Sequence, residues 1–259
     1  MKLAASIHRK LPVQAAIAAV VIVILVASAK AIDTDLFSLA GNLDQMGVVF
    51  SKLASPDWSY LPKVLPAVAE TLQMAITGTI LGAAAAIPIA FLATAPMTGS
   101  RLLSTIVRGF LNIIRTVPDL LLAALFVAVV GIGLFTGMLA IAVFTFGVVS
   151  KLVYEAIDTI DQGPVESLTA VGATRTHVAR YAVVPQILPN MISYTLYAFE
   201  INVRASTVLG YVGAGGVGVT LQASMGLMRY DRVSVIIISI FVVVLAIDAF
   251  SAWARRRLL

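Results

Sequence analysis

Apolar runs of about 20 residues recur along the chain, and they constrain its fold more than any other feature. A helix of about 20 residues is long enough to cross the roughly 30 Å of hydrocarbon in a bilayer. With 60% hydrophobic and only 12% charged residues, the 259-residue chain does not have the composition of a soluble domain. A transmembrane barrel would instead show alternating segments of about ten residues. We therefore predict an all-α, polytopic membrane protein.

Six runs are long enough to span a membrane as helices, and small residues indicate how some of them pack. Gly78 and Gly82 permit close helix contact in the second run. Gly131, Gly133 and Gly137 predict the turn that separates the third run from the fourth. The six predicted spans cover approximately residues 11–29, 67–95, 106–131, 135–154, 192–209 and 233–253.

The first run has two interpretations. Ala27, Ser28 and Ala29 form the A-x-A pattern of a signal-peptide cleavage site. The run is longer than the apolar region of most signal peptides, however, and further spans follow it. We expect a retained first transmembrane helix, with cleavage as the alternative.

Residues 33–60 are predicted to form an external loop that contains a short amphipathic helix. Trp58 and Tyr60 stand where aromatic side chains anchor a chain at the membrane interface. Acidic side chains along the loop favour contact with water, and they are Asp33, Asp35, Asp44 and Asp57.

The lysines and arginines predict the orientation of the helices. With six spans, most cations fall on one side, which the positive-inside rule assigns to the cytoplasm. Both termini are therefore expected in the cytoplasm. Lys52, Lys63, Arg229 and Arg232 lie on the other side, against the rule. The cations on the predicted cytoplasmic side are Lys2, Arg9, Lys10, Arg101, Lys151, Arg175, Arg180, Arg255, Arg256 and Arg257.

A polar segment from Glu155 to Asn190 interrupts the apolar runs and is predicted to face water. Pro164 suits the first position of a helix, and Glu166 then lies in the first turn, near the positive end of the helix dipole. Gly172 is expected to end this helix after about two turns. The pattern predicts a short surface helix.

A second helix is expected to follow in the same segment. Thr174 can cap its start, and Pro185 and Pro189 are expected to prevent its continuation beyond Val184. An ordinary amphipathic loop would share these features, so the pattern by itself assigns no role. Small apolar side chains form a ridge at Ala170, Val171 and Ala173.

The order of three residues in this segment resembles a known family. Gly172 follows Glu166 by six residues, and Pro185 follows Gly172 by thirteen. This spacing resembles the cytoplasmic signature loop of ABC-importer permeases, which reads E-A-A, three residues, G, nine residues, I-x-L-P. The chain departs from that pattern at the two alanines and at the Ile and Leu, where it has Ser167, Leu168, Ala182 and Val184.

Six further stretches are similar to the phosphonate-type branch of these permeases. By this resemblance, residues 63–257 form a permease core that contains the loop 155–190, and residues 1–62 form the first helix with its external loop. The similar stretches are residues 150–157, 162–167, 184–189, 193–197, 200–210 and 212–218.

The resemblance implies the membrane subunit of an ATP-driven importer of type I fold, for phosphonate or a related phosphorus oxyanion, in a bacterial inner membrane. It implies a homodimer that works with two copies of a cytoplasmic ATPase and an external substrate-binding protein, without nucleic acid. ATP and Mg²⁺ would bind to the ATPase, and this chain would hold no cofactor. The helix at about residues 163–174 would be the coupling helix, with ATPase contacts at Pro164, Glu166, Ser167, Ala170, Gly172, Ala173, Thr174 and Arg175.

Other sequence patterns indicate no chemistry in this chain. No glycine is followed by lysine, so there is no G-x-x-x-x-G-K-[ST] loop for ATP. With no cysteine and only two histidines, His8 and His177 in separate regions, no metal site and no catalytic residue is predicted. A G-x-G-x-x-G match lies in an expected external segment instead of after a strand, so dinucleotide binding is rejected. We expect these glycines to form a tight or re-entrant turn at the mouth of the pathway: Gly213, Gly215, Gly216 and Gly218.

Ionisable residues inside predicted spans are candidates for a translocation pathway. Arg115 and Asp119 flank Pro118, and Glu200 and Arg204 have the same spacing, so each couple can meet on one helix face. One interpretation is a pair that only neutralises itself. In the other, the arginines favour an anion in the pathway and Pro118 breaks the helix near a gate. No role is assigned to two acids nearer the span ends, Glu70 and Asp248.

Two other classes of protein remain alternatives. A membrane-embedded enzyme would need a nucleophile–base pair or a metal cluster at membrane depth. A passive channel would have no ATPase partner. Within the permease class, phosphite, phosphate or a methionine-like solute are the alternatives to phosphonate.

Overall fold

The computed structural model describes residues 3–32 and 41–258, and these residues form helices and turns without any strand. The predicted all-α fold is confirmed. Lys2, Asp33 and Asp35 lie outside the described residues. The chain divides into two compact units, Met1–Ser51 and Lys52–Leu259.

The first unit consists of one long helix and most of a short one. In α1 (Leu3–Ala31), the segment Leu11–Ala31 is apolar enough to cross a membrane and has no buried residue. The short helix expected in the external loop is α3 (Leu43–Leu53), which also has no buried residue.

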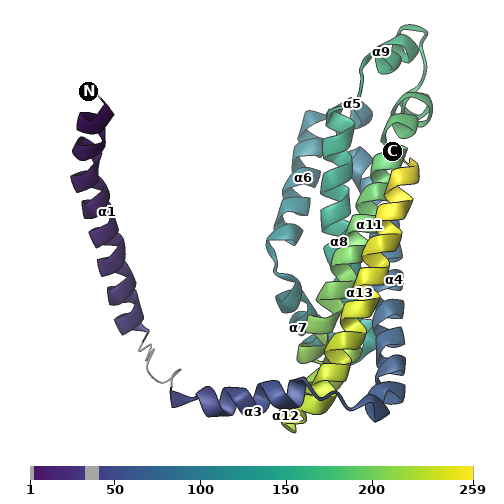
Figure 1. Ribbon diagram of the computed structural model, residues 1–259. Coiled ribbons are helices and arrows are strands. Elements are labelled where there is room, and N and C mark those ends of the chain that lie inside the picture. The colour runs from purple at the N-terminus through teal and green to yellow at the C-terminus, as the bar shows by residue number, and fades with distance from the viewer. Residues whose placement is uncertain (1–2, 33–40, 259) are drawn as a thin grey trace. The chain divides into compact units, whose positions relative to one another are not determined.

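The second unit is a helical bundle in which α4, α8, α11 and α13 run along one another (Figure 1). Its first half contains η1 (Trp58–Tyr60), α4 (Leu61–Leu92), α5 (Ala95–Thr98), α6 (Arg101–Thr116), α7 (Asp119–Val130) and α8 (Leu134–Asp158). Its second half contains α9 (Gly163–Ala170), α10 (Arg175–Val178), the π-helical turn η2 (Ala179–Val183), α11 (Val184–Leu209), η3 (Gly210–Val212), α12 (Val217–Gly226) and α13 (Tyr230–Leu258).

Among the described residues, four helices are long and apolar enough to cross a membrane, and the number rises to six if each of two bent helix pairs is one span. The bent pairs are α6 with α7 and the α10–η3 run with α12. The prediction of about six spans therefore agrees with the structure only if broken helices are counted.

The contact between α4 and α8 forms the centre of the bundle. A Cβ atom added to Gly78 would lie 2.7 Å from Cγ2 of Ile141, and one added to Gly82 would lie 2.7 Å from Cβ of Thr145. Both distances are too short for real atoms, so only glycine lets α8 lie directly on the α4 backbone. The predicted close packing is confirmed. The buried apolar residues around this contact include Ala83, Ala86, Ala90, Leu111, Val149, Val153 and Ile187.

The turn between α7 and α8 lies where two of the three predicted glycines place it. Gly131 and Gly133 have φ values of 99° and 143°, which favour glycine. Gly137 does not belong to the turn, because it lies inside α8, where a Cβ atom would collide with Met74 and Ala214. Its predicted role is wrong, and its small size serves helix packing instead.

A buried amide joins three helices at the middle of the bundle. Asn202 on α11 has no exposed surface, and its Nδ2 donates hydrogen bonds of 2.7 Å to the hydroxyls of Thr79 on α4 and Thr145 on α8. Hydrogen bonds between helices in a membrane contribute about 0.6 kcal/mol each on average. Because these bonds are directional, they fix how α4, α8 and α11 are rotated relative to one another.

The predicted third span is broken. α6 ends at Thr116 and α7 begins at Asp119, with a bend of 86° between them. Pro118 disfavours the helical conformation at Val117, which has φ −78° and ψ 121°. With 16 and 12 residues, each helix is shorter than the roughly 20 residues of a span. The prediction of one helix over residues 106–131 is therefore wrong, although the break at Pro118 was expected.

The prediction that two prolines end the second helix of the polar segment is also wrong. α10, η2 and α11 follow one another without interruption from Arg175 to Leu209. Pro185 directly follows the π-helical turn η2, and Pro189 lies inside α11. The polar segment therefore continues directly into the bundle.

Gly82→Ala is expected to destabilise the bundle, because the added methyl group would overpack the α4–α8 contact at a cost of about 1–3 kcal/mol. Gly109→Ala is the matched control, since Gly109 lies in α6 with nothing within 4 Å of an added Cβ atom. An alanine there favours the helix by about 0.5–1 kcal/mol. The unfolding temperature measured in detergent should fall for Gly82→Ala and should stay the same or rise for Gly109→Ala. Equal unfolding temperatures would contradict the close contact.

Candidate coupling loop and translocation pathway

The surface helix predicted in the polar segment is α9, which extends beyond the ends of α8 and α11 (Figure 1). Pro164 lies in its first positions and Glu166 in its first turn, as predicted. The N–H of Gly163 donates a 3.0 Å hydrogen bond to Oδ1 of Asp161 and so begins the helix. No residue of α9 is fully buried. Val165 and Leu168 are partly buried, with Val165 packed against the core, and the other six side chains of the helix are exposed.

Gly172 reverses the chain after α9. Its φ value is 79°, in the left-handed region that favours glycine. Its N–H donates to the Thr169 carbonyl at 3.0 Å, and the Ala173 N–H donates to the Leu168 carbonyl at 3.0 Å. The last carbonyls of the helix are thereby satisfied, and Val171 remains 80% exposed at the tip.

Two side chains fasten the return of the loop to the bundle. Thr174 caps α10 by accepting a hydrogen bond from the His177 N–H at 3.5 Å. Nη1 of Arg175 donates to the Thr98 carbonyl at 2.7 Å. The guanidinium lies where a Cβ atom of Gly99 would be, so Gly99 must lack a side chain. Arg175 therefore connects the loop to the segment that joins α4 with α6.

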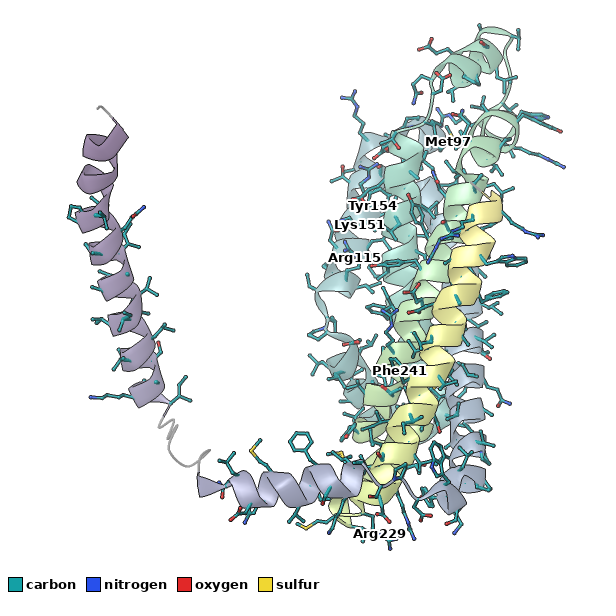
Figure 2. The ribbon with its side chains drawn as sticks, viewed as in Figure 1. Met97, Arg115, Lys151, Tyr154, Arg229 and Phe241 are labelled. Atoms are coloured by element: carbon teal, nitrogen blue, oxygen red, sulfur yellow. The ribbon has the colours of Figure 1, made fainter. Side chains whose placement is uncertain are left out.

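Gln186 fastens the outgoing part of the loop, a role that the sequence did not indicate. Its Oε1 accepts from the Asp161 N–H at 3.0 Å, and its Nε2 donates to the Asp161 carbonyl at 3.2 Å. A long amide that pairs with one backbone unit gives no periodic signal in the sequence. Beside the loop, a cavity of about 220 Å³ opens between α4, α5 and α10, with Met97 on its wall (Figure 2).

The predicted pair in α11 exists, within a larger charge group. Nη2 of Arg204 lies 2.6 Å from Oε1 of Glu200 and 3.0 Å from both carboxylate oxygens of Asp248 on α13. Nη2 of Arg255 lies 3.3 Å from Oε2 of Glu200. We call these four residues the α11–α13 charge group. Its two cations and two anions neutralise one another.

Asp248 was assigned no role from the sequence, and the structure places it at the centre of this group. It lies seven residues before Arg255, the first of the three arginines in the last turn of α13, which is about 10 Å along the helix, and is therefore inside the apolar span but toward that end. The available signal was that it is the one ionisable residue between Val233 and Trp253. Its partner could not be identified from the sequence, because Arg204 lies 44 residues away.

The predicted pairing of Arg115 with Asp119 is wrong. The break at Pro118 turns the two residues onto separate helices, and Oδ1 of Asp119 instead accepts from the Leu120 N–H at 2.9 Å. Asp119 lines a small cavity of about 10 Å³ with Asn202, whose Oδ1 has no hydrogen-bond partner among the described residues. Arg115 lies across α8, with Cγ 3.0 Å from the position of a Cβ atom on Gly147.

The glycine segment after α11 forms the tight turn that was predicted, but inside the bundle. Gly213, Gly215 and Gly216 have φ values of 84°, 86° and 73°. The Val217 N–H then donates to Oγ1 of Thr71 at 2.8 Å. Thr71 lies ten residues into α4, about 15 Å from the start of that helix, so the turn is re-entrant.

Gly218 does not belong to this turn. It lies in α12, where a Cβ atom would collide with the Thr207 carbonyl and lie 2.8 Å from Cα of Gly210. Because the described residues contain no strand before the glycines, the structure provides no context for a dinucleotide site.

Two of the four cations that oppose the positive-inside rule, Arg229 and Arg232, have acidic neighbours. Arg229 pairs with Asp231 at 3.0 Å, and Arg232 lies 3.9 Å from Asp57 and stacks over the Tyr60 ring. The hydrogen bond and charge of Asp231 raise the pKa of the exposed Arg229 guanidinium above its ordinary value. These pairs reduce the net positive charge at this end, so the cations are weak evidence against the predicted orientation.

Residues 86–259 match the family of binding-protein-dependent transport system inner membrane components. The match includes the polar segment with α9, the α11–α13 charge group and the re-entrant glycines. The chain belongs to this family. It is therefore a permease subunit of an ABC importer, and the membrane-embedded enzyme alternative is set aside.

Named relatives and a solved structure agree with this family. The phosphite transport system permease protein PtxC of Stutzerimonas stutzeri is 36% identical over 222 residues, which cover 86% of this chain and 81% of that protein. The putative cryptic phosphonate transport system permease protein PhnE2 of Escherichia coli is 44% identical over 119 residues, 46% of this chain and 98% of that protein. A chain of the inward-facing MetNI methionine ABC transporter superposes with a TM-score of 0.70 at 23% identity, over 78% of this chain and 99% of that chain. At 23% identity, the likeness to the MetNI chain shows a similar fold and nothing more.

Arg204→Gln is expected to destabilise the second unit, because it leaves Glu200 and Asp248 without their shared cation. An uncompensated charge costs up to about 2.5–3.5 kcal/mol at the middle of a span and less toward its ends. Adding Asp248→Asn should restore part of the loss, since Asp248 is the carboxylate left without a cation, whereas Glu200 keeps Arg255. Thermal unfolding of both variants in detergent tests this, and a double variant no more stable than the single one would show that the two side chains do not interact.

Proposed function

We propose that this chain is the permease of an ATP-driven importer for phosphonate or a related phosphorus oxyanion, in the inner membrane of a bacterium. The observation that carries the substrate class is the 36% identity to a phosphite permease over 86% of this chain. The 44% identity to a putative phosphonate permease supports the same class. In this proposal two copies of the chain work with two copies of a cytoplasmic ATPase and an external substrate-binding protein.

We infer that α9 is the coupling helix. It is short, all its residues except the partly buried Val165 and Leu168 are exposed, and Gly172 and Gly163 define its two ends. Because α10, η2 and α11 form one uninterrupted helical run, a displacement of the loop by the ATPase would be passed directly to α11. ATP and Mg²⁺ would bind to the ATPase, and the contact would involve the predicted residues Pro164, Glu166, Ser167, Ala170, Gly172, Ala173, Thr174 and Arg175.

Within the bundle, the two candidate arginines differ in a way that bears on the pathway. Arg204 is already neutralised by two carboxylates, which favours a structural role between α11 and α13. Arg115 has no acidic partner within 4.0 Å among the described residues and lies next to the break at Pro118. We therefore place Arg115 on the pathway and treat Pro118 and the re-entrant glycines as the parts of the backbone that can open and close it.

Glu166→Lys is expected to weaken ATPase docking, because it places a cation at the positive end of the α9 dipole. Gly172→Pro should have the same effect, since proline requires φ near −65° where the structure has 79°. Gly226→Ala, at the opposite end of the bundle with free space around it, is the control. Co-purification of the ATPase and substrate-stimulated ATP hydrolysis measure the result. Normal coupled transport in the Glu166 and Gly172 variants would contradict the coupling assignment.

Reconstitution tests the function as a whole. The chain, its ATPase and its binding protein in proteoliposomes should take up radiolabelled phosphonate, phosphite or phosphate only with ATP inside, and a Walker-lysine variant of the ATPase is the control. Uptake that continues without ATP would indicate a passive channel. ATP hydrolysis by this polypeptide alone, or a complex that transports only an uncharged or cationic solute, would contradict the proposal.

A further inference from the structure

The helix α6 carries a polar stripe along one side, made of Arg101, Thr105, Arg108, Asn112 and Arg115. The three arginines are spaced seven residues apart. Because seven residues make almost two full helical turns, each arginine is rotated by only about 20° around the helix axis from the one before, and all three lie on the same face. All five side chains are exposed or partly exposed. We call this set the α6 polar stripe.

The opposite side of α6 is apolar and equally exposed. Leu102, Ile106, Phe110 and Ile113 are between 54% and 72% exposed. A helix of a membrane protein that exposes an apolar face and a charged face lies between two solvents, because a charge at membrane depth is unstable against hydrocarbon. The apolar face suits lipid. The polar stripe therefore faces water or a charged partner.

The innermost residue of the stripe is Arg115. It lies fourteen residues after Arg101, about 21 Å along the helix. Its side chain crosses α8 at Gly147, where the missing Cβ atom leaves room for it. Lys151 lies one turn further along the same face of α8, and Figure 2 shows Arg115, Lys151 and Tyr154 following one another along the bundle.

The charges around the stripe do not cancel. Arg108 forms an ion pair of 2.9 Å with Asp158 and lies 4.6 Å over the Tyr154 ring. Lys151 forms an ion pair of 3.3 Å with Glu155. Arg101 and Arg115 have no acidic side chain within 4.0 Å among the described residues, in contrast to Arg204, which has two. The stripe with Lys151 therefore has a positive surplus that extends inward to Arg115.

We propose that the α6 polar stripe is a transit site for the phosphorus oxyanion, with Arg115 as the innermost cation and Asn112 as a neighbouring hydrogen-bond donor. This inference rests on the proposed function. A planar guanidinium donates two parallel hydrogen bonds to a tetrahedral oxyanion, and Asn112 can donate a further one from the next turn. Lys151 adds positive charge near the site, but its ion pair with Glu155 keeps it from binding the anion strongly. A site with one uncompensated cation would bind the anion weakly enough to release it, as transport requires.

Uptake by the reconstituted complex tests the site. Arg115→Gln should reduce oxyanion uptake by about fivefold or more, the effect of losing one ion pair at 4 Å even in water. Arg115→Lys should retain more uptake than Arg115→Gln, because it keeps the charge, but less than the unmodified complex, because an ammonium group cannot donate the two parallel hydrogen bonds. Arg256→Gln removes the same charge from an exposed position near the end of α13 and should leave uptake unchanged.

Folding and lipid effects are separated by two further measurements. ATPase co-purification and binding-protein-stimulated ATP hydrolysis should remain normal in Arg115→Gln, so that lost uptake cannot be attributed to misassembly. The uptake defect should be equal in vesicles of phosphatidylcholine alone and in vesicles with added phosphatidylglycerol. A defect that requires the anionic lipid would assign the arginine to a lipid phosphate and overturn the transit site.

The outcomes distinguish this inference from the proposed function. If the unmodified complex takes up phosphorus oxyanions and Arg115→Gln does so at the same rate, the transit site is wrong and the function stands. Loss of uptake in Arg115→Lys equal to that in Arg115→Gln, with assembly lost in both, would make the residue structural and also overturn the site. If the unmodified complex takes up no phosphorus oxyanion, the proposed function fails and the transit site with it.

Discussion

The scarcity of water inside a bilayer is the constraint on which this structure depends. Each backbone group in the hydrocarbon must find a partner within the protein, and helices provide it locally. Polar side chains need partners as well, and the bundle supplies them between helices. Asn202 holds α11 to α4 and α8 through two hydroxyls, and Asp248 holds α13 to α11 through Arg204. The same chemical need therefore determines which helices are joined and at what rotation.

Irregular backbone occurs in the bundle only where neighbouring helices can compensate for it. The glycine turn at residues 213–216 lies against Thr71, whose hydroxyl accepts a backbone N–H that follows the turn. The break at Pro118 lies beside α8, which the side chain of Arg115 crosses at Gly147. These two interruptions are the places where the helical hydrogen bonding is already open, so a change of conformation disturbs fewer bonds there than in α4 or α8.

The polar segment with α9 and the charged residues of the bundle are held in different ways. Hydrogen bonds of Gln186 and Arg175 join the two ends of this segment to its neighbours, Gly172 forms the turn at its tip, and it continues into α11 as one helical run. The α11–α13 charge group joins the other half of α11 to α13. Arg115 on α6 is the exception, since its charge is not used inside the described chain. This difference could not be inferred from spacing, which is four residues for both predicted pairs.

The sequence by itself determined the helical class, the short surface helix with its glycine end, the close packing at Gly78 and Gly82, and the family resemblance. These features depend on local properties: run length, the conformational freedom of glycine, and residue order. The sequence also predicted the pair of Glu200 and Arg204 within α11, but only the tertiary structure decided which charges meet between helices. Arg115 and Asp119 are separated because Pro118 turns the chain by 86°, and Arg204 finds Asp248 across 44 residues. Local rules also failed at Pro185 and Pro189, which lie in the continuous helical run from α10 to α11. Pro185 directly follows the π-helical turn, where the regular hydrogen bonding four residues back is already interrupted.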